Sequence, residues 1–170
     1  ALNAALASNA NIAIGRFSLA ANTAASNLAL GVQALQANTT GTPNLAVGLS
    51  ALFANTTGIN NLAIGNNALV NNLSALNQIS SVGGNLTIQN NAGLLNLSGL
   101  SNVSSVGESL MIENNDLLAS LSGLDKITSI GTSLKIVNNA VLISLNGLDK
   151  LSAIGDMLDI SNNDGLASLK

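Results

Sequence analysis

The fold is decided by a stretch that reads LSGLDKITSIGTSLKIVNNAVLIS, residues 121–144. It is one of four copies of a 24-residue unit, and a glycine marks the same place in every copy: Gly83, Gly107, Gly131 and Gly155. A fixed period of this length is typical of repeat architectures, in which each copy buries apolar residues against the next. Residues 73–170 are therefore expected to form one stack of equivalent coils.

An alternating triplet recurs once in each copy. In Leu134-Lys135-Ile136 the outer residues are apolar and the middle one is polar, which is the period-two pattern of a strand with Leu and Ile turned inward. No stretch between the turn signals has the longer periodicity of a helix. The triplet predicts a strand in every coil and hence a parallel β-solenoid; its other copies are Leu86-Thr87-Ile88, Leu110-Met111-Ile112 and Leu158-Asp159-Ile160.

Residues 1–72 contain a different and shorter repeat. Its marker, Asn-x-Ala-x-Gly, recurs at residues 11–15, 27–31, 44–48 and 61–65, with spacings of 16, 17 and 17. Turn-forming Asn, Thr and Gly separate the markers, so each copy predicts two short strands and two turns. The chain is therefore predicted to be all-β, with a short-repeat β-roll over 1–72 followed by a larger solenoid over 73–170.

Composition removes several classes of function. The chain has no His and no Cys, so the commonest general base, disulfides and the usual transition-metal ligands are absent. Charged residues make up 8%, and all but Arg16 lie from Glu108 onward. A net charge of −3 without basic clusters argues against nucleic acid as a partner. No apolar run approaches the ~20 residues of a membrane span, so membrane insertion is not expected.

Asparagines recur at fixed places in both repeats. One interpretation is a structural ladder, in which stacked amides bond to the turn backbone and to each other. The alternative is calcium, with oxygen ligands from two coils: Asn114, Asn115 and Asp116, and Asn162, Asn163 and Asp164. The ladder is favoured because only two of the four long copies carry the acidic residue. The ladder candidates are Asn90, Asn114, Asn138 and Asn162, the next column Asn91, Asn115, Asn139 and Asn163, and Asn27, Asn44 and Asn61 of the short repeats.

The recurring glycines are expected at turns, in conformations with positive φ, because no Lys-Ser/Thr follows them as in a phosphate-binding loop. They are Gly15, Gly31, Gly48 and Gly65 of the short repeats and the four markers of the long ones. The carboxylates are read as surface charge, so no catalytic, cofactor-binding or metal site and no enzyme activity are expected. Glycosylation triplets at Asn38, Asn55, Asn72, Asn85, Asn96 and Asn102 are ascribed to the Asn- and Ser-rich composition.

Each of the two repeats resembles a known family of repeats. The Asn-x-Ala-x-Gly unit with its Asn-Thr-Thr-Gly turns resembles the head repeats of trimeric autotransporter adhesins and related tail-fibre-like proteins. That resemblance implies a trimer of β-rolls, with Ala13, Ala29, Ala46 and Ala63 as close-packing positions. The 24-residue unit is similar to the leucine-rich-like receptor L-domain solenoids of bacterial surface proteins, which serve as scaffolds or recognition surfaces.

The leading hypothesis is a structural shaft segment of an extracellular fibre, appendage or adhesin on a bacterial surface. The triplet Leu28-Ala29-Leu30 is small or apolar on both faces, so a lone roll would expose an apolar face. Identical chains are therefore the expected partners, as a trimer by analogy or a higher ring. Leu169-Lys170 begins a fifth long copy, so we expect a fragment or ends covered by neighbouring subunits.

Two alternatives remain open. The outward residues of the long repeats, such as Met111 and Lys135, differ from coil to coil and could form a recognition module for a cell-surface glycan or protein. The Thr pairs at 39–40 and 56–57 make an ice-binding solenoid a remote alternative, because such surfaces use regular Thr arrays.

Overall fold

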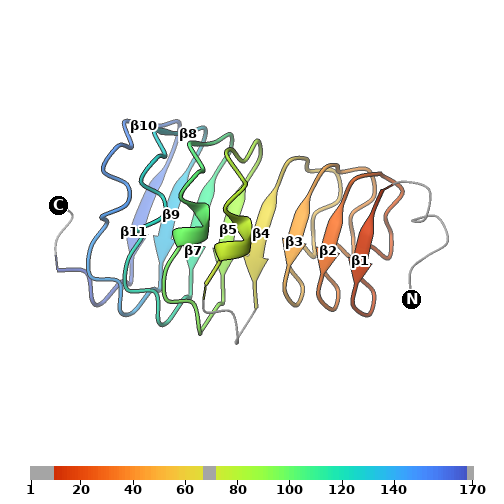
Figure 1. The fold of residues 1–170 in the computed structure, drawn as a ribbon, viewed down its shortest axis with the longest axis horizontal. Coiled ribbons are helices and arrows are strands. Elements are labelled where there is room, and N and C mark those ends of the chain that lie inside the picture. Colours follow the sequence, from red (N-terminus) through yellow and green to blue (C-terminus); the bar gives the residue numbers. More distant parts are fainter. Residues whose placement is uncertain (1–9, 67–71, 168–170) are drawn as a thin grey trace. The chain divides into compact units, whose positions relative to one another are not determined.

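The computed structural model describes residues 10–66 and 72–167, and it confirms the predicted parallel β-solenoid. The described chain contains short parallel strands and two short 3₁₀ helices (Figure 1). Contacts divide it into two compact units, Ala1–Asn66 and Asn67–Lys170. We refer to them as the short-coil unit and the long-coil unit. Leu169 and Lys170 lie outside the described residues.

One strand per coil forms the sheet of the short-coil unit. The strands are β1 (Ile12–Ile14), β2 (Leu28–Leu30), β3 (Leu45–Val47) and β4 (Leu62–Gly65). They pair in parallel and in register, so equivalent residues stack on one another along the unit. The register follows from the 16- and 17-residue spacing, because each coil returns the chain to the same place.

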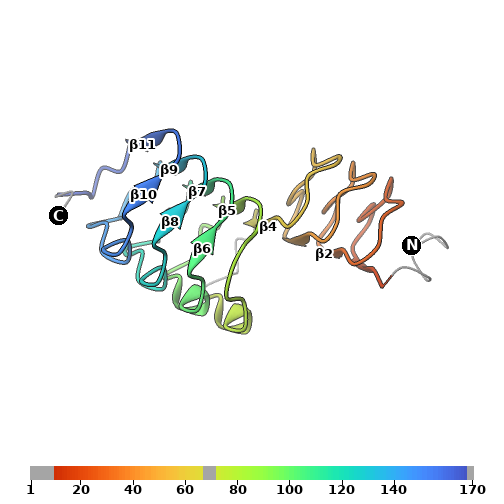
Figure 2. The same cartoon turned by 90° about the horizontal axis from the view of Figure 1, so that it is seen from above.

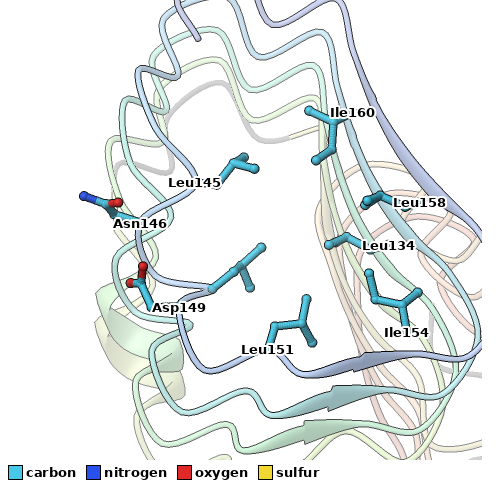
Figure 3. A pocket seen from close by; sticks show the side chains of 9 residues that line it. Leu134, Leu145, Asn146, Asp149, Leu151, Ile154, Leu158 and Ile160 are labelled. Carbon is cyan, nitrogen blue, oxygen red and sulfur yellow. The ribbon is translucent and has the colours of Figure 1, made fainter. Parts of the chain in front are cut away.

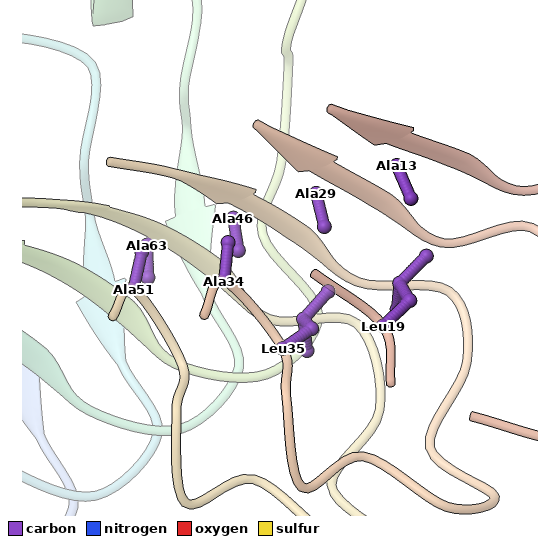
Figure 4. Close-up of a cluster of buried hydrophobic side chains, with 8 residues drawn as sticks. All are labelled: Ala13, Leu19, Ala29, Ala34, Leu35, Ala46, Ala51 and Ala63. Atoms are coloured by element: carbon purple, nitrogen blue, oxygen red, sulfur yellow. The ribbon is translucent and has the colours of Figure 1, made fainter. Parts of the chain in front are cut away.

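Alanine fills the interior of this unit. Ala13, Ala29, Ala46 and Ala63, the middle residues of the strands, are buried, and they pack with Leu19, Leu35, Ala34 and Ala51 from the opposite side of the coil (Figure 4). The flanking Ile12 and Ile14 point the other way and are 52% and 63% exposed. A coil of this length leaves room for thin side chains between its two sides, so the large residues of β1–β3 lie outside.

The turns of the short coils use left-handed backbone at residues that are not glycine. Two columns run through three coils, one of Phe17, Gln33 and Ser50 and one of Leu19, Leu35 and Leu52, all with φ between 50° and 62°. A left-handed conformation costs an L-residue roughly 1–2 kcal/mol. The tight return of a short coil therefore stores strain at fixed places.

The long-coil unit has two sheets, which lie on different sides of the coil (Figure 2). The first contains β5 (Leu86–Gln89), β7 (Leu110–Glu113), β9 (Leu134–Val137) and β11 (Leu158–Ser161), paired in parallel at an offset of 24 residues. The second contains β6 (Ser105–Val106), β8 (Ser129–Ile130) and β10 (Ala153–Ile154). The 3₁₀ helices are η2 (Ser74–Leu76) and η3 (Ser98–Leu100).

The interior of the long-coil unit is made of Leu, Ile and Val. In β5 and β7 the predicted inward residues Leu86, Ile88, Leu110 and Ile112 are fully buried. Further buried Leu and Val residues from the turns fill the space between the two sheets. The prediction that the triplet turns its Leu and Ile inward is therefore correct for this unit.

The glycines of the two units differ in backbone conformation but share a stacking constraint, since a Cβ at Gly15 or Gly31 would collide with the carbonyl of the marker glycine in the following coil. Gly15, Gly31 and Gly48 have φ of 135°, 140° and 117°, as expected for turn glycines. The same expectation is wrong for Gly65, which ends β4, and for the markers of the long repeats, because none of these glycines has a positive φ; the long-repeat markers are Gly83, Gly107, Gly131 and Gly155. At Gly107, Gly131 and Gly155 a Cβ would collide with the carbonyl of the marker glycine in the preceding coil. Stacking, and not turn conformation, excludes a side chain there.

A second glycine column shows where this constraint begins. A Cβ at Gly99, Gly123 or Gly147 would collide with the carbonyl of a leucine in the preceding long coil. The first long copy has Ala75 at this position, in η2, where no earlier long coil supplies such a carbonyl. Glycine therefore occupies this position in the coils that stack on a preceding long coil, and alanine occupies it in the first long copy.

Candidate functional site

A column of buried asparagines runs through the long-coil unit. Asn91, Asn115 and Asn139 are fully buried, and the backbone N–H of each donates to the side-chain oxygen of the asparagine in the following coil at 2.9–3.2 Å. The amide of Asn115 also donates to the carbonyl of Ile88, and that of Asn139 to Ile112, both at 3.0 Å. Each amide thus satisfies buried backbone groups of two coils. Asn163 accepts the last of these bonds.

The neighbouring asparagine column has another role. Asn90, Asn114, Asn138 and Asn162 all have left-handed backbone, with φ between 54° and 57°. Asparagine tolerates this conformation better than most residues. One side-chain bond links two of them, from the amide nitrogen of Asn138 to the oxygen of Asn114 at 3.0 Å. This column therefore shapes the turn, while the buried column joins the coils.

The short-coil unit has its own ladder, and it runs in the opposite direction. The backbone N–H groups of Asn27, Asn44 and Asn61 donate to the side-chain oxygen of the asparagine in the preceding coil, at 2.8–3.0 Å. The amide nitrogens of Asn27 and Asn44 reach the carbonyls of Gly41 and Gly58. The same residue type thus joins coils in both units.

A further ladder in the short coils was missed by sequence reasoning. The amide of Asn38 donates to the oxygen of Asn22 at 2.6 Å, and that of Asn55 to the oxygen of Asn38 at 2.8 Å. Its signal was the 16- and 17-residue recurrence of these asparagines, which the repeat already displayed. Asn38 is 0% exposed, so its glycosylation triplet is inaccessible in the folded unit.

The carboxylates of the long coils serve as partners of nearby groups. Asp125 and Asp149 accept the backbone N–H of Gly123 and Gly147 in the glycine turns. Glu113 pairs with Lys135 at 2.8 Å, and this hydrogen bond and charge raise the pKa of Lys135 above its ordinary value.

The calcium alternative gains no support from these contacts. Within residues 10–66 and 72–167 no group of three or more acidic side chains lies together. The amide oxygen of Asn115, one of its proposed ligands, accepts two bonds from Asn91. That oxygen is also buried within the stack.

The outer face of the short-coil sheet is apolar. It consists of two columns on β1–β3, one with Ile12, Leu28 and Leu45 and one with Ile14, Leu30 and Val47, all exposed or half-buried. We call this surface the outer apolar face. It contains no charged side chain, and Arg16 is the single charged residue of the described short-coil unit. At β4 the equivalent Leu62 and Ile64 are buried.

The last long coil surrounds an apolar groove. The groove has a volume of about 250 Å³ and is lined by Leu134, Leu145, Asn146, Leu148, Asp149, Leu151, Ile154, Leu158 and Ile160. Leu145, Leu151, Ile154 and Ile160 point into the hollow, while Asn146 and Asp149 lie at its rim (Figure 3). The hollow is the interior of the last described coil, and its lining brings together no catalytic set.

The described part of the chain contains no helix long and apolar enough to cross a membrane. Comparison with family models, with curated proteins and with solved structures gave no match.

Proposed function

We propose that this protein is a structural segment that assembles with identical chains through the outer apolar face. The observation that carries the proposal is the phase of the short-coil strands, which bury alanine and leave the larger Leu, Ile and Val residues outside. Exposed apolar surface of this kind marks interaction sites in folded proteins. Burying one such side chain contributes roughly 1.5–3 kcal/mol.

Absence of charge on the face supports a partner of the same kind. Self-association places like charges close together whenever a face carries them, and the outer apolar face carries none. A second copy offers the same flat aliphatic columns, with equal spacing along the sheet. The resemblance to trimeric adhesin heads favours three chains around one axis.

The mass of the native assembly tests this proposal. We expect an oligomer from the unaltered chain in light scattering, and a monomer from the double variant Ile12→Lys/Ile14→Lys, because lysines on the face would be buried or repel each other. Thr57→Lys, an exposed turn position of the same unit, is the matched control and should leave the oligomer intact. A monomeric unaltered chain, or an oligomer that survives the double variant, would contradict the proposal.

We further propose that the assembly belongs to an extracellular fibre or adhesin. Two resemblances to surface-protein repeats support it, as does a construction in which rigidity comes from stacked coils and asparagine ladders without cysteine. Antibodies against the folded chain should label intact cells of the organism that makes it. Labelling that requires permeabilised cells would contradict this location.

A recognition role for the long coils has one observation in its favour. Leu95, Leu117, Val141 and Ile143 are exposed on two adjacent columns where other coils have Gly or Ala. Packing therefore does not require their size. If they bind a glycan or protein, Ile143→Ser should abolish binding to surface-glycan arrays or to cells, while Ala119→Ser should not.

A further inference from the structure

An apolar patch lies on one side of the second and third long coils. Leu117 and Val141 form its first column, 49% and 41% exposed, and Ala119 and Ile143 form the next, with Ile143 62% exposed. The backbone N–H of Ile143 donates to the carbonyl of Ala119 at 3.3 Å, so the two coils are direct neighbours here. A described coil lies on either side of this pair of coils. We call these four residues the lateral patch.

The chemistry of the lateral patch favours a protein partner. Its two columns carry aliphatic side chains alone, without an aromatic ring, a charge or a hydrogen-bonding group. Sites for small ligands combine apolar walls with a few placed polar groups that fix orientation. A patch without such groups is suited to another apolar protein surface.

The sizes along the columns are complementary under a two-fold rotation. The second column alternates large and small residues in successive coils, at Leu95, Ala119 and Ile143. A two-fold axis that crosses the stack between the second and third long coils places the second coil of one copy opposite the third coil of another. Ile143 then faces the small Ala119 of the second copy, and Leu117 faces Val141 at the centre. Such a contact uses the same patch on both chains.

Charge beside the patch agrees with the same register. The adjoining column also alternates, with Ala92, Asp116, Ala140 and Asp164 in successive long coils. In the two-fold register each aspartate lies opposite an alanine of the second copy, so no two carboxylates meet. A shift by one coil would place Asp116 opposite Asp116 or Asp164 of the second copy, and like charges across an interface are unfavourable.

A contact of this size is weak when it acts alone. Stable interfaces use about 20–30 residues on each side, and the lateral patch with its neighbours offers fewer. A single pair of patches therefore associates only at high protein concentration. Chains that are already assembled through the outer apolar face would present several lateral patches and gain avidity.

We propose that the lateral patch pairs with the lateral patch of a second copy in antiparallel orientation, with the second long coil of each chain opposite the third. The proposal names the partner of residues for which a recognition role is considered above. It does not depend on the outer apolar face, since it uses residues of the long-coil unit alone. The contact joins separate assemblies side by side.

Sedimentation of the Ile12→Lys/Ile14→Lys variant isolates this contact, because that variant lacks the outer apolar face. We expect a monomer in dilute solution and a reversible dimer at roughly 1 mM. Adding Leu117→Lys should weaken dimerisation at least ~10-fold, because each copy would then bury a lysine in place of a leucine. Thr128→Lys, exposed beside the second sheet, is the matched control and should change dimerisation less than ~2-fold. A monomer at roughly 1 mM, or equal dimerisation with Leu117→Lys and Thr128→Lys, would overturn the proposal.

Introduced thiols report the orientation, because the chain has no cysteine. Ala92→Cys and Asp164→Cys, made separately in the same lysine background, change exposed residues three repeats apart, about 14 Å along the stack. In the antiparallel register these two positions face each other. We expect a short thiol cross-linker to join a mixture of the two variants into a heterodimer and to leave either variant alone largely unlinked. Equal linking of Ala92→Cys alone would indicate a parallel contact and overturn the proposal.

Discussion

The short-coil and long-coil units use the same apolar-x-apolar triplet in opposite phase. In β2 of the short coils the middle residue, Ala29, faces the interior and its Leu neighbours face outward. In β7 of the long coils the middle residue, Met111, faces outward and Leu110 and Ile112 face the interior. Because strand residues alternate between two faces, a shift of one residue exchanges the whole set. The comparison teaches that coil size selects the phase.

The units also differ in how their turns are made. The short coils hold Phe17, Gln33 and Leu35 in left-handed conformations, while the described long coils reserve this conformation, apart from glycine, for asparagines such as Asn114. Seven or eight more residues per coil give the chain room to turn with favoured backbone. A short coil therefore has a thinner core and a more strained backbone.

The largest expected effect comes from exchanging the interior residues of the two units. Leu110→Ala should lower the free energy of unfolding of the long-coil unit by about 2–5 kcal/mol, because it leaves a cavity. Ala46→Leu should destabilise the short-coil unit by about 1–3 kcal/mol, because the thin interior cannot accept a larger side chain. Hydrogen exchange resolved by mass spectrometry reports each unit separately. If Ala46→Leu stabilised the short-coil unit, its interior would not be too thin for leucine, and the explanation of the two phases by coil size would be wrong.

An intermediate effect is expected in the asparagine columns. Asn115→Ala should cost ~3 kcal/mol, because it leaves the backbone N–H of Asn91 and the carbonyl of Ile88 without their buried partners. The adjacent Asn114→Ala, at a turn position, should cost only about 1 kcal/mol. Urea denaturation of both variants measures the difference. If both variants lowered the free energy of unfolding equally, the buried asparagine column would not stabilise the unit more than the turn column does.

The smallest effect concerns the strained turns. Gln33→Gly should raise the free energy of unfolding of the short-coil unit by up to ~1 kcal/mol, since glycine adopts the left-handed conformation without steric cost. Asn138→Gly in the long coils should be close to neutral, because asparagine already tolerates that conformation. Thermal unfolding followed by hydrogen exchange compares the two. A loss of stability at Gln33→Gly would show that its side chain matters more than its backbone.

Much of the fold could be predicted because the repeats display it directly. The spacing of the marker glycines gives the coil lengths, and the triplets of the long repeats give both the strand and its inward face. The role of the marker glycines could not be predicted in the same way. A recurring glycine can reflect either a turn conformation or a close approach of backbone from a neighbouring coil, because both exclude a side chain. The sequence shows that glycine recurs but does not distinguish between these two causes.

The asparagine ladders were anticipated in part. The recurrence of Asn91, Asn115 and Asn139 indicated stacking, but nothing in the sequence distinguishes that column from the left-handed one beside it. The ladder of Asn22, Asn38 and Asn55 was overlooked because these residues look like ordinary turn formers. Burial separates a ladder from a turn, and burial is a property of the assembled coils.

By itself the sequence determined that both units are stacks of parallel strands, since only a coil that returns to the same place brings equivalent residues into register every 16, 17 or 24 residues. The tertiary structure alone decided which face of the short-coil triplets is buried. Alternation along a strand defines two faces but does not say which of them is buried. When both faces are apolar, as in Leu28-Ala29-Leu30, the width of the closed coil determines which residues fit in the interior.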